Sequence, residues 1–247
     1  MIIDAHCHLA DEGAKAQTLD DLLRQMDAFK VDCSVVCPSE REIALRNREG
    51  NRRLAALVRS HRDRLIGMAV ANPWHGDEAL TIMREAEELG LFGLKVHPPL
   101  QGMQLSDELL DPLVEFASGR GWPVYCHTGT PICSEPLQLV ELARRHPETS
   151  VIMGHMGWSD FAGDVIHAAR LSPNIYLETS HATGSFVHAA VGQLGSARFL
   201  FGSDSPASTL DAELFKFSTV PLTAEDRANL LGRTAVGLFP VPKGKGF

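Results

Sequence analysis

The chain has 247 residues, a formal net charge of -8 at pH 7, 44% hydrophobic residues and 22% charged residues. A chain of this length and apolar content can bury one large core. The acidic balance argues against nucleic acid as a partner, because phosphate-binding proteins usually present a basic face. No apolar run reaches the length that spans a membrane. We therefore expect a globular protein that acts on a small molecule, without a membrane partner.

The cysteines and the first residues bear on the cellular compartment. Five cysteines form an odd set, and none has the CxxC spacing of a structural zinc site. The first residues contain no basic stretch followed by an apolar core, the pattern of a secretory signal. We expect a reduced protein in the cytoplasm.

Short apolar runs alternate along the chain with longer segments whose apolar residues recur at helical spacing. The strand candidates are residues 1–6, 33–37, 65–71, 92–97, 123–127, 150–155, 174–179 and 198–203. The helix candidates are 18–29, 46–61, 77–89, 106–117, 135–146, 159–171 and 224–238. Thr18 and Ser106 suit N-caps, while Gly90 and Gly121 follow helix ends where a left-handed residue is often needed. This alternation predicts one domain over residues 1–247, an α/β fold closed into a single (β/α)8 TIM barrel.

A barrel of this kind carries its functional residues at the carboxyl ends of its strands. Polar side chains occur at these positions in six of the predicted strands. They are His6 and His8, Lys95 and His97, His127, His155, Glu178 and Asp204. The sequence therefore predicts that these residues meet at one end of the barrel.

Strand geometry assigns directions to these side chains. Successive residues of a strand point to opposite faces, so His6 and His8 share a face and form half of a metal site. The same alternation turns Tyr125 and His127 into the barrel. In the last strand, Phe199 and Phe201 face the helices, which leaves Asp204 inward.

These motifs resemble the amidohydrolase superfamily, in the amidohydrolase-related group that includes aminocarboxymuconate semialdehyde decarboxylase and pyrone-dicarboxylate lactonase. The likeness rests on residues 3–8, 93–98, 126–129, 154–157 and 201–206, which span nearly the whole chain. The resemblance implies one divalent metal ion, commonly zinc, with two ions as the alternative. The implied ligands are His6, His8, His127 and Asp204. His155 would contact the activated water or substrate, or act as a further ligand in two-metal members.

The implied chemistry suits these residue types. Imidazoles and a carboxylate bind zinc and leave a coordination position open for water. The metal lowers the pKa of that water towards roughly 7 and polarises a carbonyl group. We expect Asp204 to accept the proton of the water. We expect His155 to steady the hydroxide or the oxyanion, and Lys95 or His97 to neutralise a substrate carboxylate.

Several assignments stay open at the level of the sequence. Lys95 is either an ordinary ammonium, which we favour, or a carbamylated bridge between two metal ions. The candidate substrate contacts are His97, Trp158, Glu178 and His181. His97 is alternatively a hydrogen-bonded rim residue, and Glu178 either orients a metal ligand or pairs with Lys95.

The sequence thus predicts a metal-dependent hydrolase of a C–N or C–O acyl bond, in an amide, lactone or ester of a small anionic metabolite. A metal-dependent decarboxylase with the same site is the nearest alternative. A barrel that binds a metal or metabolite without catalysis is the second. Lys95 and His97 stand where TatD-like deoxyribonucleases place a glutamate, which argues against nuclease activity. A homodimer is compatible with this kind of barrel.

Overall fold

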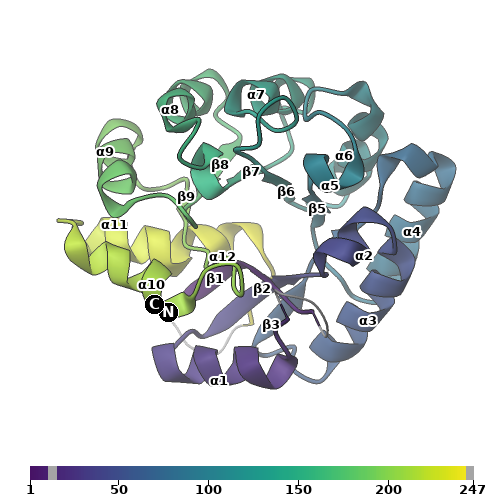
Figure 1. Ribbon diagram of the computed structural model, residues 1–247, viewed down its shortest axis with the longest axis horizontal. Helices are drawn as coiled ribbons and strands as arrows, with labels where there is room; N and C mark the ends of the chain where they lie inside the picture. Colours follow the sequence, from purple (N-terminus) through teal and green to yellow (C-terminus); the bar gives the residue numbers. More distant parts are fainter. Residues whose placement is uncertain (11–15, 243–247) are drawn as a thin grey trace.

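The structure is a computed structural model that describes residues 1–10 and 16–242. Parallel strands form its centre, and helices surround them (Figure 1). The strands are β1 (Ile3–His8), β2 (Cys33–Cys37), β3 (Leu65–Gly67), β4 (Ala69–Val70), β5 (Leu94–Val96), β6 (Val124–His127), β7 (Val151–Gly154), β8 (Ile175–Glu178) and β9 (Phe199–Leu200). They pair in chain order in two sheets, β1 to β3 and β4 to β9.

Two seams join these sheets into a closed barrel. At Met68, the main-chain N–H donates to β2 at 2.9 Å, whereas the N–H of Ala69 donates to the carbonyl of Gly93 at 3.1 Å. β3 and β4 are therefore one strand that changes partner along its length. At the other seam, the N–H of Ala5 donates to the carbonyl of Phe201 at 2.8 Å. The eight resulting strands form the predicted (β/α)8 barrel.

The helices form the outer layer of the barrel (Figure 1). They are α1 (Leu19–Phe29), α2 (Glu40–Ala44), α3 (Asn47–Arg59), α4 (Asp77–Glu88), α5 (Pro98–Gln101), α6 (Asp111–Ser118), α7 (Pro136–Arg145), α8 (Ala162–Leu171), α9 (Gly184–Leu194), α10 (Leu210–Phe215), α11 (Ala224–Ala228) and α12 (Thr234–Leu238). A π-helical turn, Asn229–Arg233, joins the last two. No helix within the described ranges is long and apolar enough to cross a membrane.

The strands are buried on both faces, which divides the core into two layers. Tyr125 and Leu200 pack inside the barrel. Cys126, Phe199 and Phe201 pack between the barrel and the helices. The side-chain directions predicted for β6 and β9 are confirmed, so the residues that end these strands are carried to the mouth of the barrel.

The helix starts and ends agree with the sequence in part. Thr18 caps α1, because its side chain accepts a hydrogen bond from the N–H three residues on at 3.2 Å. Gly90 and Gly121 have the left-handed φ values of 85° and 64°. The prediction that Ser106 caps a helix is wrong, because α6 begins at Asp111. Pro112 lacks an N–H and fits only the first helical turn, so the helix cannot extend back to residue 106.

Four helices were not predicted, namely α2, α5, α9 and α10. α2 begins after Ser39, which forms a capping box with Glu42. The sequence displays this signal as S-x-x-E, a pattern typical of helix starts. α9 carries apolar residues over most of its surface, so it has little helical periodicity to detect. α2 matters for function because it borders the mouth of the barrel.

Candidate metal centre

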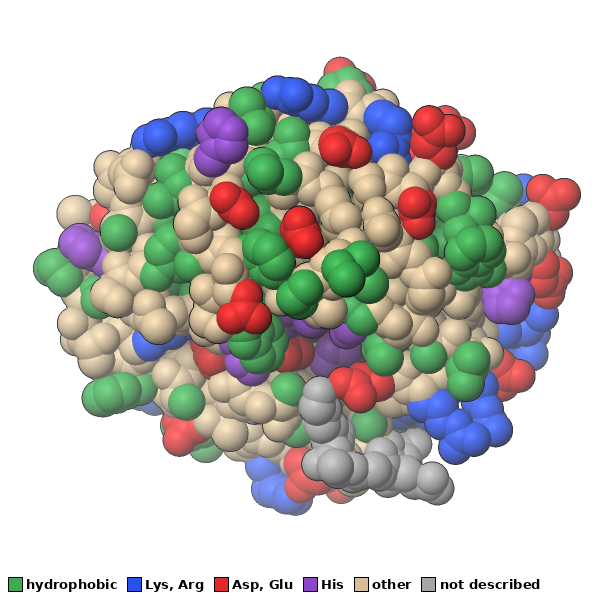
Figure 2. All heavy atoms as spheres, turned by 45° about the horizontal axis from the view of Figure 1, so that its top comes forward, with side chains coloured by type: hydrophobic (Ala, Val, Ile, Leu, Met, Phe, Trp, Pro, Cys, Tyr) green, Lys and Arg blue, Asp and Glu red, His purple; other side chains and the backbone are tan. Residues whose placement is uncertain are grey.

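The carboxyl ends of the strands surround a cavity of about 810 Å³. Side chains of the barrel form its inner part, and α2 with the start of α3 forms its outer wall. Histidine side chains lie at the bottom of this hollow in Figure 2. The predicted site residues that line it are His6, His8, Lys95, His97, His127, His155, Trp158 and Asp204. The tertiary structure thus brings most of the predicted set to one place.

Three predicted ligands converge on one point. Nε2 of His6 lies 3.1 Å from Oδ1 of Asp204, and Nε2 of His8 lies 3.6 Å from the same oxygen. Nδ1 of His8 lies 2.7 Å from the carbonyl oxygen of Pro38, which can only accept a hydrogen bond. Nδ1 of His8 therefore carries the proton, and Nε2 presents a lone pair to Asp204. Nε2 of His8 and Oδ1 of Asp204 are both acceptors, so a cation bound between them would stabilise this arrangement.

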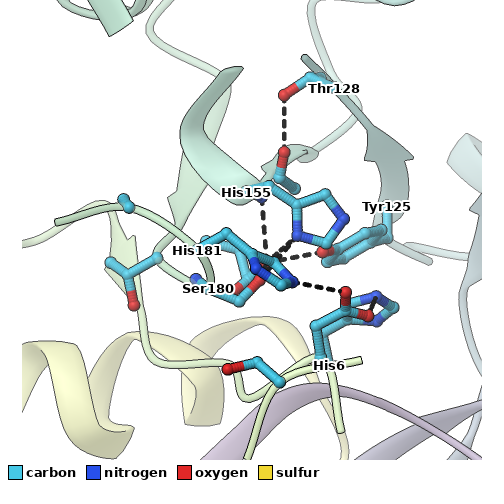
Figure 3. A network of polar contacts seen from close by, with 12 residues as sticks. His6, Tyr125, Thr128, His155, Ser180 and His181 are labelled. Atoms are coloured by element: carbon cyan, nitrogen blue, oxygen red, sulfur yellow. Dashed lines mark hydrogen bonds and ion pairs between the residues drawn. The ribbon is translucent and has the colours of Figure 1, made fainter. Parts of the chain in front are cut away.

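Asp204 is held on its other oxygen as well. Oδ2 lies 2.8 Å from Nε2 of His181 (Figure 3). Burial alone would raise the pKa of Asp204, but the neighbouring His155, His181 and His6 outweigh burial and hold this pKa well below its usual range. Asp204 is therefore a carboxylate, the form that binds a metal ion.

His155 and His181 form a second group with Asp204. One potential ligand atom from each of the three lies within 4.8 Å of the others. The ring of His181 stacks on that of Trp158, with centroids 4.0 Å apart. His181 was predicted as a substrate contact; it contacts Asp204 directly, and its role towards the substrate stays a prediction. Its place in a loop after β8 explains why no strand pattern assigned it this position.

His127 and His97 form a stacked pair at the side of the cavity. Their ring centroids are 4.0 Å apart at an interplanar angle of 10°. Nε2 of His127 lies 3.0 Å from Oγ1 of Thr130, and His127 is outside both three-residue groups. Nδ1 of His97 is buried without a hydrogen-bond partner among the described residues. His97 lines the cavity as a residue, while the roles of His97 as a substrate contact and of His127 as a metal ligand stay predictions.

Lys95 is fully buried beside the three converging ligands. Its Nζ lies 3.3 Å from Nε2 of His6 and 4.1 Å from the centre of the Tyr125 ring. The aromatic face compensates part of the cost of burying the charge. Burial lowers the pKa of Lys95 below its ordinary value. The lysine thus supplies positive charge next to the centre at a desolvation cost.

Glu178 is completely buried and lies behind the cavity lining. Oε2 accepts hydrogen bonds from the hydroxyl groups of Tyr125 at 2.6 Å and Ser180 at 2.8 Å. The sequence left open whether Glu178 pairs with Lys95 or orients a ligand. Its contacts favour orientation, because Ser180 in turn lies 2.7 Å from Nδ1 of His155. Ser180 was missed by the sequence reasoning, since a loop serine carries no periodic signal.

The backbone is strained where the site residues sit. His155, His181 and Asp204 have φ values of 66°, 61° and 49°, in the left-handed region that non-glycine residues rarely adopt. Strained backbone of this kind clusters at functional sites, where the surrounding structure holds it. Three such residues on three successive strand ends mark this end of the barrel as the functional one.

The donor set fits a divalent metal ion. Burial lowers the pKa values of His6 and His155 well below the usual range, and that of His127 to about 3. The imidazoles are therefore neutral at physiological pH, as metal ligation requires. Neutral imidazoles and a carboxylate suit zinc and similar first-row ions.

Comparison with known proteins identifies the family of the chain. The model of the amidohydrolase family matches residues 3–241, and the chain belongs to that family. It is an enzyme of the amidohydrolase superfamily with the TIM-barrel fold. No protein of curated function matches the sequence.

Solved structures share the fold at low sequence identity. A 5-carboxyvanillate decarboxylase from Sphingomonas paucimobilis is 15% identical with a TM-score of 0.79, over 98% of this chain and 99% of its own. A dihydroxybenzoic acid decarboxylase from Polaromonas sp. JS666, solved with manganese and 2-nitroresorcinol, is 16% identical with a TM-score of 0.74, over 96% of both chains. A putative 2-pyrone-4,6-dicarboxylic acid hydrolase from Pseudomonas putida is 18% identical with a TM-score of 0.71, over 96% of both chains. Similar folds thus include both decarboxylases and a hydrolase.

Proposed function

We propose that the protein is a metal-dependent hydrolase that cleaves a C–N or C–O acyl bond in a small anionic molecule. The observation that carries the proposal is the convergence of Nε2 of His6, Nε2 of His8 and Oδ1 of Asp204 at the inner end of an open cavity. A divalent ion bound there would supply an activated water and polarise the substrate carbonyl. Zinc suits this set of nitrogen and oxygen donors best.

The side chains around this point have separate tasks in hydrolysis. Asp204 accepts a proton from the attacking water and returns it to the leaving group. His155 faces the same space and holds the attacking oxygen in position. Lys95 attracts the substrate carboxylate, because it lies at the cavity lining beside the ligands, and His97 of the same lining contacts the substrate. His127 completes the ligand set if its Nε2 leaves Thr130.

Decarboxylation of an aromatic or unsaturated acid is the second candidate. It is favoured by the two decarboxylases among the similar structures, one of which is a manganese protein. In that reaction Asp204 would take up a proton from solvent and pass it to carbon as carbon dioxide leaves, and Lys95 would bind the substrate carboxylate. The two candidates therefore differ in where the proton goes.

Product analysis tests both candidates. The protein is loaded with zinc or with manganese and assayed against amides, lactones, esters and aromatic acids that carry a carboxylate. Oxygen from labelled water in the product supports hydrolysis, and release of carbon dioxide supports decarboxylation. Asp204→Asn is expected to abolish turnover, while Asp164→Asn, on the exposed face of α8, is expected to retain it. Full turnover by metal-loaded Asp204→Asn would overturn both mechanisms.

A further inference from the structure

A buried chain of hydrogen bonds reaches His155 from behind the cavity. Nδ1 of His155 lies 2.7 Å from Oγ of Ser180, and this Oγ lies 2.8 Å from Oε2 of Glu178 (Figure 3). The three residues are at most 2% exposed. The chain therefore connects an acid that substrate cannot reach to an imidazole that lines the cavity.

The donors around Glu178 fix the direction of this chain. Main-chain N–H groups face both carboxylate oxygens, that of Ser180 at 2.5 Å from Oε1 and that of His155 at 3.1 Å from Oε2. The hydroxyl of Tyr125 donates to Oε2 as well. A carboxylate surrounded by donors accepts from every neighbour. The single hydroxyl proton of Ser180 consequently points to Glu178, which leaves Oγ to accept a proton from Nδ1 of His155.

The main chain packs closely around the carboxylate of Glu178 and the hydroxyl of Tyr125. A Cβ atom at Gly202 would lie 2.3 Å from Oε1 of Glu178, so the backbone packs directly against the carboxylate. A Cβ atom at Gly154 would lie 2.4 Å from the hydroxyl oxygen of Tyr125. The carboxylate is thus enclosed by protein groups and keeps its set of donors.

We propose that Glu178, acting through Ser180, holds His155 as the tautomer protonated on Nδ1. Nε2 of His155 then presents a lone pair to the cavity. Glu178 and Ser180 are positioning residues, since they touch neither substrate nor reacting atoms. A neutral imidazole held this way binds a cation or accepts a hydrogen bond from water, but it cannot donate one to an oxyanion. The inference deepens the proposed function, because it assigns His155 to the attacking water or the metal ion.

Histidine NMR tests the tautomer directly. The full chain is labelled with 15N-histidine, and the long-range spectrum distinguishes protonated from unprotonated ring nitrogens. His155→Asn identifies the signals of His155. The wild-type protein is expected to show a protonated Nδ1 and an unprotonated Nε2 at this residue. Ser180→Ala removes the acceptor and is expected to shift His155 towards the form protonated on Nε2.

Two further variants separate the relay from a general loss of packing. Tyr125→Phe removes another donor to Glu178 without touching the relay, so His155 is expected to keep the wild-type pattern. Glu178→Gln keeps an oxygen for the three donors that face Oε2 but removes the negative charge at the end of the chain, so it is expected to weaken the preference of His155 for protonation on Nδ1. Should Glu178→Gln fail to fold, Ser180→Ala decides the question, because it removes only one buried oxygen.

The outcomes of this experiment do not depend on turnover. A wild-type His155 protonated on Nε2, or a tautomer unchanged in Ser180→Ala, would overturn the inference even if the enzyme is an active hydrolase. Conversely, a protein that shows the expected tautomers but no metal-dependent activity would overturn the proposed function alone.

Discussion

The carboxylate of Asp204 is shared with His181, whose Nε2 lies 2.8 Å from Oδ2. This contact turns the other oxygen, Oδ1, towards Nε2 of His6 and His8. His181 is itself held by stacking on Trp158. A loop residue outside the predicted ligand set thus determines how the central carboxylate faces its histidines.

Replacement of His181 by alanine is therefore expected to weaken metal binding. Without its partner on Oδ2, the carboxylate of Asp204 is free to rotate away from His6 and His8. The affinity for zinc should fall about 10- to 100-fold, the usual effect of removing a group that orients a ligand. Competition with a chromophoric chelator measures this change. His167→Ala, at an exposed position of α8, is the matched control. Equal affinities in the two variants would contradict this role of His181.

Metal loading is expected to stabilise the folded protein through His6 and His8. At a free zinc concentration about 100-fold above Kd, linkage contributes about 2.7 kcal/mol. For a chain of this size, that corresponds to a rise in Tm of roughly 5–10 °C. Scanning calorimetry with and without a chelator measures the shift. The variant with alanine at both His6 and His8 should lose this rise in Tm. A rise that persists in the variant would show that the ion binds elsewhere.

The metal-free protein is expected to lose stability as the pH falls below 6.5, and His127 contributes to this loss. Burial lowers its pKa from 6.5 to about 3, so between these values the unfolded chain binds a proton that the folded chain does not. Folding stability therefore rises with pH in this window, by about 1.4 kcal/mol per pH unit for one such group.

His127→Gln isolates this contribution. Asp4 acts in the opposite direction, because burial raises its pKa to about 7 and the folded state then holds the extra proton. Because Asp4 is present in both proteins, the free energies of unfolding of wild type and variant are compared, by urea unfolding at pH 7.5 and pH 5.5. Between these two pH values the stability of the variant should change by about 1.4 kcal/mol less than that of the wild type, because the unfolded His127 takes up about half a proton on average over this range. An identical slope would mean that His127 is not buried in its neutral form.

Lys95→Met is expected to separate stability from activity. The methionine keeps most of the stem and removes a buried charge whose desolvation is costly, so the free energy of unfolding should rise by about 1 kcal/mol. Activity towards an anionic substrate should fall, because the positive charge beside His6 is lost. Urea unfolding and steady-state kinetics measure the two effects, with exposed Lys30→Met as the control. A destabilised variant would mean that the contact with Tyr125 outweighs the cost of burial.

Much of this architecture could be predicted from periodicity. The alternation of strands and helices specified the closed barrel, and the two-residue period placed His6 and His8 on one face. Asp204 could be assigned to the same end of the barrel because it follows the last strand. The start of α6 was less predictable, because Ser106 suits an N-cap whereas Pro112 favours a start at Asp111.

The residues that refine the site were not predictable in this way. His181 and Ser180 lie in the loop after β8, where the backbone is left-handed at His181 and that residue bonds to the distant Glu213 and Asp204. Side-chain rotation, and not strand direction, decides that His127 turns to Thr130.

The sequence by itself determined which side chains reach the mouth of the barrel, because strand periodicity is a local property of the chain. Only the tertiary structure decided how those side chains are oriented. Orientation depends on hydrogen bonds between strand ends far apart in the chain, such as that of Asp204 with His181 and the relay from Glu178 to His155.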